Sequence, residues 1–305
     1  MITGDVAAGL PGDEPGARSD WAPRERRRPI IQAAARDSLR RRRRQGRSVQ
    51  VLCVLATAVG LAPLVALVYY TLDRGFGGIS LGFLTHAPVP EGVPGGGIST
   101  AIVGTGEIVG LALLMAVPVG LLAALFLHER RGHLAAAVRF GADLLTGVPS
   151  IVIGIFAYAV LVRPLHHFSN LAASFALAVL MLPIMIRANE EAMRTVATDL
   201  WEAGVALGAR RSRVARSVVL RGALPGLVTG NLLALSRGVG ETAPLLFTVA
   251  APTMAMTLLI YSEGTQPFPD EQQTAWATAL LLLVFVLLLS AAARLVAWRL
   301  TRRAR

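Results

Sequence analysis

Residues 49–72 read VQVLCVLATAVGLAPLVALVYYTL, a run of mostly apolar side chains without a single charge. A helix of about 20 such residues crosses the hydrocarbon core of a bilayer. Five further apolar stretches follow along the chain, at residues 98–127, 145–162, 168–186, 223–250 and 273–298. Because backbone polar groups cannot stay unpaired in lipid, these stretches predict an all-α polytopic membrane protein with six transmembrane helices.

The composition supports a membrane protein and excludes several classes of enzyme. Only 16% of the 305 residues are charged, whereas soluble domains carry about 25% charged residues. All 30 lysine-or-arginine positions are arginines, so the chain lacks the lysine of a P-loop ATPase and any Schiff-base lysine. The single cysteine, Cys53, excludes an internal disulfide and a cysteine zinc site. The six stretches contain no histidine, HExxH motif or GxSxG motif, which argues against a membrane protease or transferase.

The first 48 residues differ in composition from the rest of the chain. They hold 12 arginines and 6 acidic residues, and residues 40–44 are five consecutive arginines. This composition predicts a disordered cytoplasmic tail at 1–48, followed by a transmembrane domain at 49–305 with its core at about 98–298. We interpret the arginine run as an anchor on membrane lipid. No aromatic side chains interleave this run, so we expect no nucleic-acid binding.

The distribution of arginines along the chain predicts the orientation in the membrane. The segments on one side hold 26 arginines: 1–48, 128–133, 187–222 and 294–305. The segments on the other side hold two: 73–97, 163–167 and 251–272. Since arginine-rich segments stay in the cytoplasm, both termini are expected there.

The loop at 187–222 carries the most specific pattern in the sequence. Residues 200–208 read LWEAGVALG, in which apolar residues recur with helical spacing and Gly208 provides a left-handed helix end. A second helix is expected in ARRSRVARSVVL at 209–220, with valines on one side and arginines towards another. Two short helices that meet at a glycine form a compact elbow, which a soluble partner can grip.

This loop resembles the EAA loop of ABC importer permeases. The residues that carry the resemblance are Glu202, Ala203, Gly204, Gly208 and Leu220. Two positions depart from the pattern, since Gly204 stands where a second alanine is usual and Arg221 where proline is usual. The segments GVPSIVIG at 147–154 and RGVGETAPLLF at 237–247 are similar to those of PstA-type phosphate permeases. The resemblance covers roughly residues 76–250.

The resemblance implies the type I fold of ABC importer permeases in a multi-pass protein of the bacterial inner membrane. It implies a translocation path for phosphate, coupled through the EAA-type loop to separate ATPase subunits. The implied partners are a second, PstC-like permease, two PstB-like ATPases and an extracytoplasmic PstS-like phosphate-binding protein. ATP and Mg²⁺ would be used by the ATPases, so we expect no cofactor, metal or catalytic residue in this chain. The alternative is a permease for another oxyanion, such as sulfate or molybdate.

Two opposite charges interrupt the fifth apolar stretch. Arg237 and Glu241 are four residues apart, which predicts one shared helix face. A charge at the bilayer centre costs at least about 2.5–3.5 kcal/mol and usually faces a bundle interior or a water path. Because arginine donates two parallel hydrogen bonds to phosphate oxygens, we interpret Arg237 as a substrate-path residue and Glu241 as the group that moderates its affinity. The alternative is a pair that only fixes helix packing.

Four further positions carry expectations. The resemblance implies that Arg187, at the cytoplasmic end of the fourth stretch, receives phosphate at the inner mouth; the alternative is a positive-inside anchor. Glu107 is expected to form a hydrogen bond with a neighbouring helix. Gly226 and Gly230 predict a close contact between helices.

Overall fold

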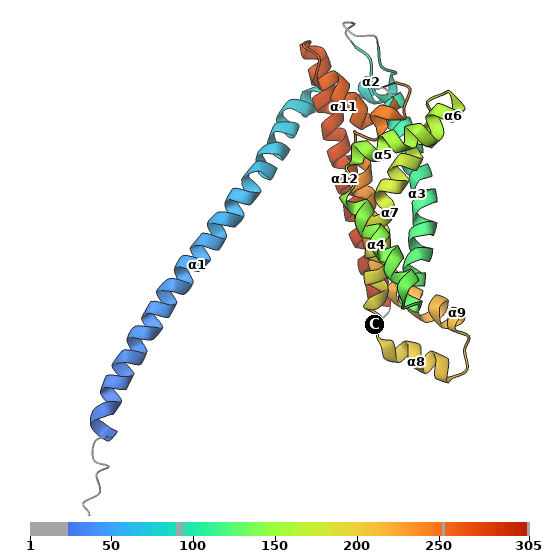
Figure 1. The fold of residues 1–305 in the computed structure, drawn as a ribbon. Helices are drawn as coiled ribbons and strands as arrows, with labels where there is room; N and C mark the ends of the chain where they lie inside the picture. The colour runs from blue at the N-terminus through green and yellow to red at the C-terminus, as the bar shows by residue number, and fades with distance from the viewer. Residues whose placement is uncertain (1–23, 90–92, 94, 252–253, 304–305) are drawn as a thin grey trace, which may run out of the picture. The chain divides into compact units, whose positions relative to one another are not determined.

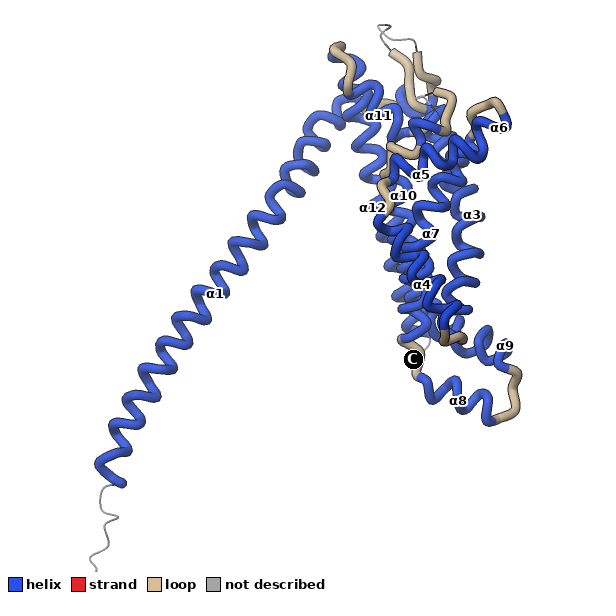
Figure 2. Tube along the Cα trace, viewed as in Figure 1, coloured by secondary structure: helices blue, strands red, loops and turns tan. Residues whose placement is uncertain are grey.

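The structure, a computed structural model, describes residues 24–89, 93, 95–251 and 254–303. Within this part of the chain every regular element is a helix (Figure 1, Figure 2). The predicted all-α class is therefore confirmed. The chain divides into two units, Met1–Ala66 and Leu67–Arg305.

The first unit contains most of helix α1 (Arg24–Gly75). The predicted disordered tail falls partly on residues 1–23, which lie outside the described residues. Residues 24–48 are helical, and the cause is local, since the alanine, arginine, leucine and glutamine that dominate this segment are strong helix formers. From Val49 onward the large apolar side chains of this unit are exposed, so this surface suits lipid or another chain.

The second unit is a helical bundle with helix α7 (Asn170–Arg194) at its centre. Helices α3 (Ser99–Glu129) and α10 (Leu220–Val239) pack against α7. Helix α12 (Pro269–Arg303) packs on α10 and on the shorter α11 (Met256–Gly264). The apolar part of α7 is 61% buried, against 28% for α3, so α7 contributes most to the core.

Small residues let α7 and α10 approach closely. A Cβ atom built on Gly226 would lie 2.8 Å from the Cβ of Ala192, and one on Gly230 would lie 2.6 Å from the Cβ of Ala188. The predicted contact at these glycines is therefore confirmed. Such close approach is common between membrane helices, because lipid removes the hydrophobic driving force for their association.

The described helices provide up to six membrane crossings. Five are long and apolar enough by themselves: Gly46–Gly78, Ser99–Glu129, Asn170–Arg194, Arg211–Val239 and Pro269–Arg299. A bent pair of helices brings the number to six if it counts as one span. The count agrees with the six predicted stretches.

The bent pair replaces the single helix expected at 145–162. Helix α4 (His133–Gly147) and the segment Ser150–Leu165 meet at an angle of 103°. The segment comprises α5 (Ser150–Ala157), the π-helical η2 (Tyr158–Val162) and α6 (Arg163–Leu165). The cause is Pro149, which has no N–H to donate and pushes Val148 into an extended conformation.

The fifth crossing is also broken, where a continuous helix was expected at 223–250. Helix α10 ends at Val239, and the chain continues as turns and the 3-10 helix η4 (Leu245–Phe247). Glycine is a weak helix former and proline lacks the N–H that a helix interior needs, so the sequence around Gly240 and Pro244 favours this ending.

At its N-terminal end, the helical run that contains α10 begins earlier than expected. The helical run begins at Arg211 with α9 (Arg211–Val214) and passes through the π-helical η3 (Ala215–Val219) into α10. Helix α8 (Thr198–Ala206) precedes it. Together, α8 and α9 form an elbow at one end of the bundle (Figure 1).

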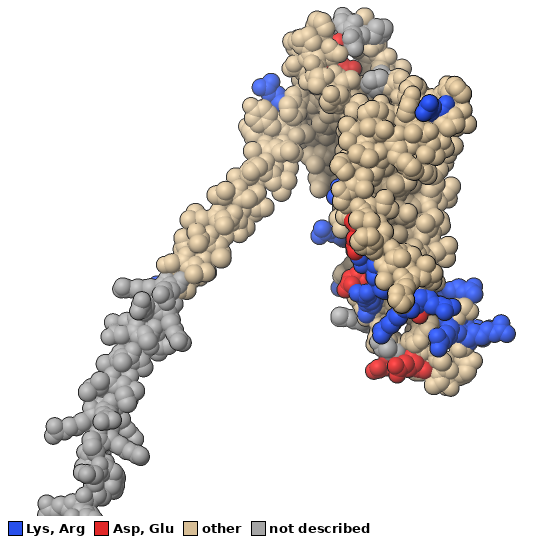
Figure 3. All heavy atoms as spheres, viewed as in Figure 1, with Lys and Arg blue, Asp and Glu red and all other residues tan. Residues whose placement is uncertain are grey.

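The opposite end of the bundle carries the short elements that connect the spans. These are η1 (Phe76–Gly78), α2 (Leu81–Thr85) and α11. Figure 3 shows that the visible arginines of the second unit gather near the elbow, with only isolated ones at the other end.

Candidate functional site

A cavity of about 130 Å³ lies at the bend between α4 and α5, against α7 and the last turn of α10. Its lining comes from the break between α4 and α5, from Pro183 in α7, and from Arg237 in the last turn of α10. Thr146 and Ser150 add hydroxyl groups to the lining. Irregular backbone at membrane depth is tolerated where it is buried in protein or lines a water-filled cavity. The break between α4 and α5 and the cavity therefore belong to one feature, which the last turn of α10 borders.

Arg237 lies at the depth of the bundle centre. Helices α7 and α10 run antiparallel, since Gly226 lies against Ala192 and a Cβ built on Gly238 would meet the sulfur of Met181. This register places Arg237 opposite the middle of the 25-residue helix α7. The Arg237 side chain is 60% exposed, so its guanidinium is open to the cavity or to a partner.

The predicted pair of Arg237 and Glu241 is present, but a turn brings it together. Because α10 ends at Val239, Glu241 follows the helix end, and its N–H donates to the carbonyl of Gly238 at 3.2 Å. The expectation of one shared helix face was wrong. Arg237 Nε lies 3.6 Å from Glu241 Oε1, an ion-pair distance that is too long for a good hydrogen bond.

This arrangement is suited to a small anion. The guanidinium of Arg237 offers several N–H donors in one plane, and Glu241 engages them only through a long ion pair. The cavity also includes Ser150 at the start of α5, where the partial positive charge of a helix N-terminus favours anions. The role of Arg237 and Glu241 in binding stays a prediction.

Arg187, the third predicted path residue, lies elsewhere. Its guanidinium donates to both carboxylate oxygens of Asp143, with Nε 2.9 Å from Oδ1. Its Nη1 is also 3.7 Å from Glu190 Oε2. Arg187 is not among the residues that line the Arg237 cavity. It ties α4 to α7, and its predicted contact with substrate remains untested.

A buried carboxylate that the sequence did not single out lies beside Arg187. The Glu190 side chain is only 2% exposed and accepts hydrogen bonds from Arg139 Nε and Arg194 Nη2, each at 2.8 Å. Arg139 also donates to the carbonyl of Leu127 at 2.9 Å. This Glu190 cluster therefore joins the middle of α4 to the ends of α3 and α7. The spacing of Glu190 from Arg194 signals one pair, but nothing in the sequence predicts the partner from α4.

A pair of amides adds a second polar tie between α7 and α10. Asn231 Nδ2 donates to Asn189 Oδ1 at 2.8 Å, and Asn189 Nδ2 donates to Asn231 Oδ1 at 3.3 Å. Asn189 is fully buried. Polar side chains that bond across helices stabilise packing in membranes by about 1 kcal/mol, so this pair fixes the register already set by the glycines.

Glu107 behaves as expected. Its Oε2 accepts a hydrogen bond from Asn170 Nδ2 at 2.7 Å, which joins α3 to the start of α7. The predicted hydrogen bond to a neighbouring helix is confirmed.

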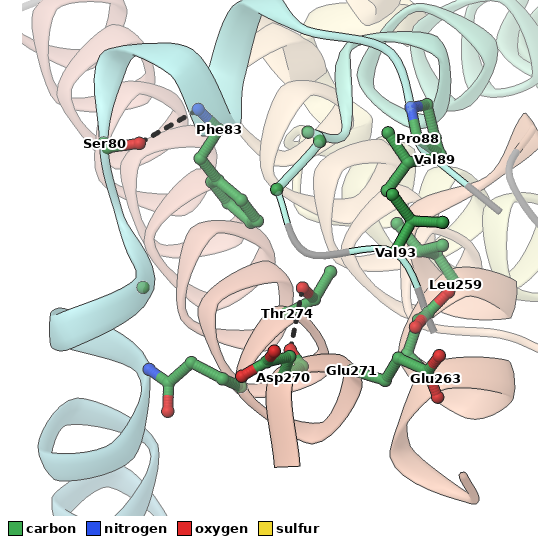
Figure 4. A pocket seen from close by; sticks show the side chains of 15 residues that line it. Ser80, Phe83, Pro88, Val89, Val93, Leu259, Glu263, Asp270, Glu271 and Thr274 are labelled. Carbon is green, nitrogen blue, oxygen red and sulfur yellow. Dashed lines mark hydrogen bonds between the residues drawn. The ribbon is translucent and has the colours of Figure 1, made fainter. Parts of the chain in front are cut away.

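A hollow of about 190 Å³ at the end of the bundle opposite the elbow has acidic walls (Figure 4). Glu263 from α11 and Asp270 and Glu271 from α12 contribute the carboxyl groups. Three carboxyl groups disfavour an anion by charge repulsion. We therefore assign the candidate anion site to the cavity at Arg237.

The elbow has the predicted construction. Gly208 has a φ of 80°, so the predicted left-handed turn is confirmed. Val214 packs against Gly204, where an added Cβ would lie 3.0 Å from the valine Cγ2. The ring of Trp201 meets that of His128 edge-on at 6.1 Å, which holds α8 against the end of α3.

The five predicted coupling residues differ in exposure. Glu202, Ala203 and Gly208 are exposed, and Gly204 is half-buried. Leu220 is also half-buried, and it packs on the hydrophobic cluster at the ends of α3, α7 and α10. Leu220 therefore does not contribute to the surface that the elbow offers to a partner. Leu207, which directly follows α8 and is 89% exposed, does contribute to it.

Comparison with known proteins identifies the family. Residues 116–302 match the family described as binding-protein-dependent transport system inner membrane component. The phosphate transport system permease protein PstA of Yersinia pestis is 36% identical, over 84% of this chain and 90% of that protein. PstA 1 of Mycobacterium tuberculosis strain H37Rv is also 36% identical, over 81% and 85%. The chain belongs to the PstA family.

Solved structures of ABC importers share the fold of this PstA-family chain. A chain of the inward-facing MetNI methionine ABC transporter matches with a TM-score of 0.56 at 22% identity, over 67% of this chain and 94% of that chain. A chain of a bacterial alginate ABC transporter matches with a TM-score of 0.60 at 15% identity, over 84% and 94%. The predicted type I importer permease fold is confirmed.

Family and fold together give the coarse function. The chain is a multi-pass permease of the inner membrane in a binding-protein-dependent ABC importer. A permease of this class works with ATPase and substrate-binding partners. The role of this chain is to shape the translocation path through the membrane.

Proposed function

We propose that this PstA-family permease imports phosphate. The supporting observation is Arg237, a guanidinium at the depth of the bundle centre that borders a cavity at the break between α4 and α5. In secondary transporters, substrate sites lie near the bilayer midplane at discontinuous helices, and the break between α4 and α5 gives this permease a comparable setting. Sulfate and molybdate are also oxyanions, but the relatives compared above are phosphate permeases, so phosphate is the favoured cargo.

The proposed assembly contains a second, PstC-like permease, two PstB-like ATPases and a PstS-like phosphate-binding protein. ATP and Mg²⁺ bind to the ATPases, and this chain contributes no catalytic group. Both termini lie in the cytoplasm, so the arginine-rich elbow faces the ATPases. The N-terminal arginine run contacts anionic lipid.

Coupling follows from the continuity of one helical run. The ATPase grips α8, and Gly204 of α8 packs on Val214 at the start of the run that ends at Val239. A displacement of the elbow therefore reaches Arg237, which lies near the other end of the same run. Closure of the ATPases on ATP shifts the bundle towards its outward-facing state, and hydrolysis returns it.

Uptake of radiolabelled phosphate tests this proposal. Arg237→Gln removes the charge, and because a hydrogen bond to a charged group contributes about 1.5–3 kcal/mol, uptake at low phosphate should fall roughly tenfold to a hundredfold. Arg163→Gln removes an exposed arginine that does not line the cavity, so it should leave uptake unchanged. Purification of the complex with both variants shows whether assembly survives.

Three results would contradict the proposal. Normal phosphate uptake in the Arg237→Gln variant would mean that the guanidinium does not meet the cargo. Loss of assembly in that variant would return Arg237 and Glu241 to a packing role. Impaired sulfate uptake with normal phosphate uptake, in cells that lack this chain, would keep the permease and replace the cargo.

A further inference from the structure

A row of exposed arginines follows the elbow. We name it the arginine ridge, and it consists of Arg210, Arg211, Arg213 and Arg216. Val214 on the same segment is buried and faces the elbow interior. No acidic residue occurs in the sequence between Glu202 and Glu241. Among the described residues, no carboxylate forms an ion pair with the ridge, although the arginines at the Glu190 cluster and the cavity all have such partners.

The ridge lies on the elbow at one end of the bundle (Figure 1). It precedes the residues of α10 that are buried in the bundle, such as Ala223 and Leu227. The ridge therefore shares this end of the bundle with α8, the helix that the proposed function assigns to the ATPase.

The ridge adjoins the surface that the proposed function assigns to the ATPase. Val214, between the ridge arginines, packs against Gly204 of α8. Glu202 on α8 and Leu207 directly after it are exposed. A protein that grips α8 therefore comes within reach of the ridge.

We propose that the arginine ridge is a second contact surface for the ATPase, where it meets acidic side chains beside the groove that receives α8. This inference rests on the proposed coupling role of α8. Arginine forks match carboxylates in a bidentate geometry. Complementary charges at the edge of an interface raise the association rate and fix the orientation more than they add affinity. The apolar and acidic α8 would thus supply the grip, and the ridge would supply attraction and alignment.

Association of the purified ATPase with the complete permease pair in nanodiscs tests the ridge. The variant Arg211→Gln/Arg213→Gln should lower the association rate about tenfold at low salt and remove most of its salt dependence. The matched control is Arg130→Gln/Arg131→Gln, which removes two adjacent exposed arginines from the loop between α3 and α4. This control should keep the wild-type rate.

Other outcomes would overturn the ridge as an ATPase contact. An unchanged rate in the ridge variant would do so, and so would an equal fall in both double variants, which would show only an effect of net charge. Loss of co-purifying phosphatidylglycerol with an unchanged rate would reassign the ridge to lipid. The variant Glu202→Lys separates the two proposals. If a permease with this substitution binds the ATPase with wild-type affinity, the proposed coupling role of α8 is wrong. If the substitution weakens binding and the ridge variant does not, only the ridge fails.

Discussion

Replacing Glu190 by glutamine tests the buried ion-pair cluster. The variant keeps the shape of the side chain but removes a charge that is 2% exposed and bonded at 2.8 Å to Arg139 and Arg194. A hydrogen bond to a charged group contributes about 1.5–3 kcal/mol, so two give an upper limit of about 3–6 kcal/mol. The arginines are 28% and 54% exposed, and water solvates them once they are released. We therefore expect the free energy of unfolding to fall by about 2–3 kcal/mol.

The neighbouring Glu191 provides a matched control. It lies on the same helix, is 74% exposed and stands 3.9 Å from Arg194, so Glu191→Gln should change the free energy of unfolding by less than about 0.5 kcal/mol. In thermal unfolding of the purified permease pair, Glu190→Gln should lower the midpoint by roughly 4–12 °C. A double-mutant cycle with Arg139→Gln should give a coupling above about 1 kcal/mol. Equal midpoints for the two glutamine variants would refute the stabilising role of the cluster.

Two further substitutions probe the contact between α7 and α10. Gly230→Ala places a Cβ 2.6 Å from that of Ala188, so overpacking should lower the free energy of unfolding by about 1–3 kcal/mol. The control Gly106→Ala has open space around the added Cβ and should lower the free energy of unfolding far less. Similar losses in the two variants would contradict the close approach of α7 and α10. Asn231→Leu leaves the buried amide of Asn189 without its partner and should cost about 1–3 kcal/mol, of which the double variant Asn189→Leu/Asn231→Leu should recover part. A double variant whose loss equals the sum of the single losses would contradict the exchange of hydrogen bonds.

The sequence is informative where a physical signal is local. Apolar length predicts the crossings, a glycine at a helix end predicts the left-handed turn at Gly208, and small residues four apart predict the contact at Gly226 and Gly230. The breaks were not predicted, because apolar composition is the same for a continuous and a broken span. Pro149 carries a local signal for the first break, because proline lacks an N–H and disfavours a helical conformation at the preceding residue.

The long-range polar contacts illustrate the other limit. Glu190 and Arg139 are 51 residues apart in the sequence, and no periodicity connects them. The assignment of Arg187 to the substrate path rested on resemblance alone. The structure gives this arginine a partner on α4, Asp143, because the packing of α4 on α7 brings the two helices together.

The two walls of the Arg237 cavity differ in freedom to move. Helices α7 and α10 are held by interlocking glycines and by the Asn189–Asn231 pair, so they behave as one rigid body. The facing wall contains the joint at Pro149, where the interrupted backbone absorbs changes in φ and ψ. Because the Arg187–Asp143 and Arg139–Glu190 ion pairs hold α4 on α7, a change in cavity width then requires α5 to swing about this joint, while the wall that carries Arg237 keeps its shape. The cargo site would thus have one rigid wall, which the ATPases displace as a block, and one hinged wall.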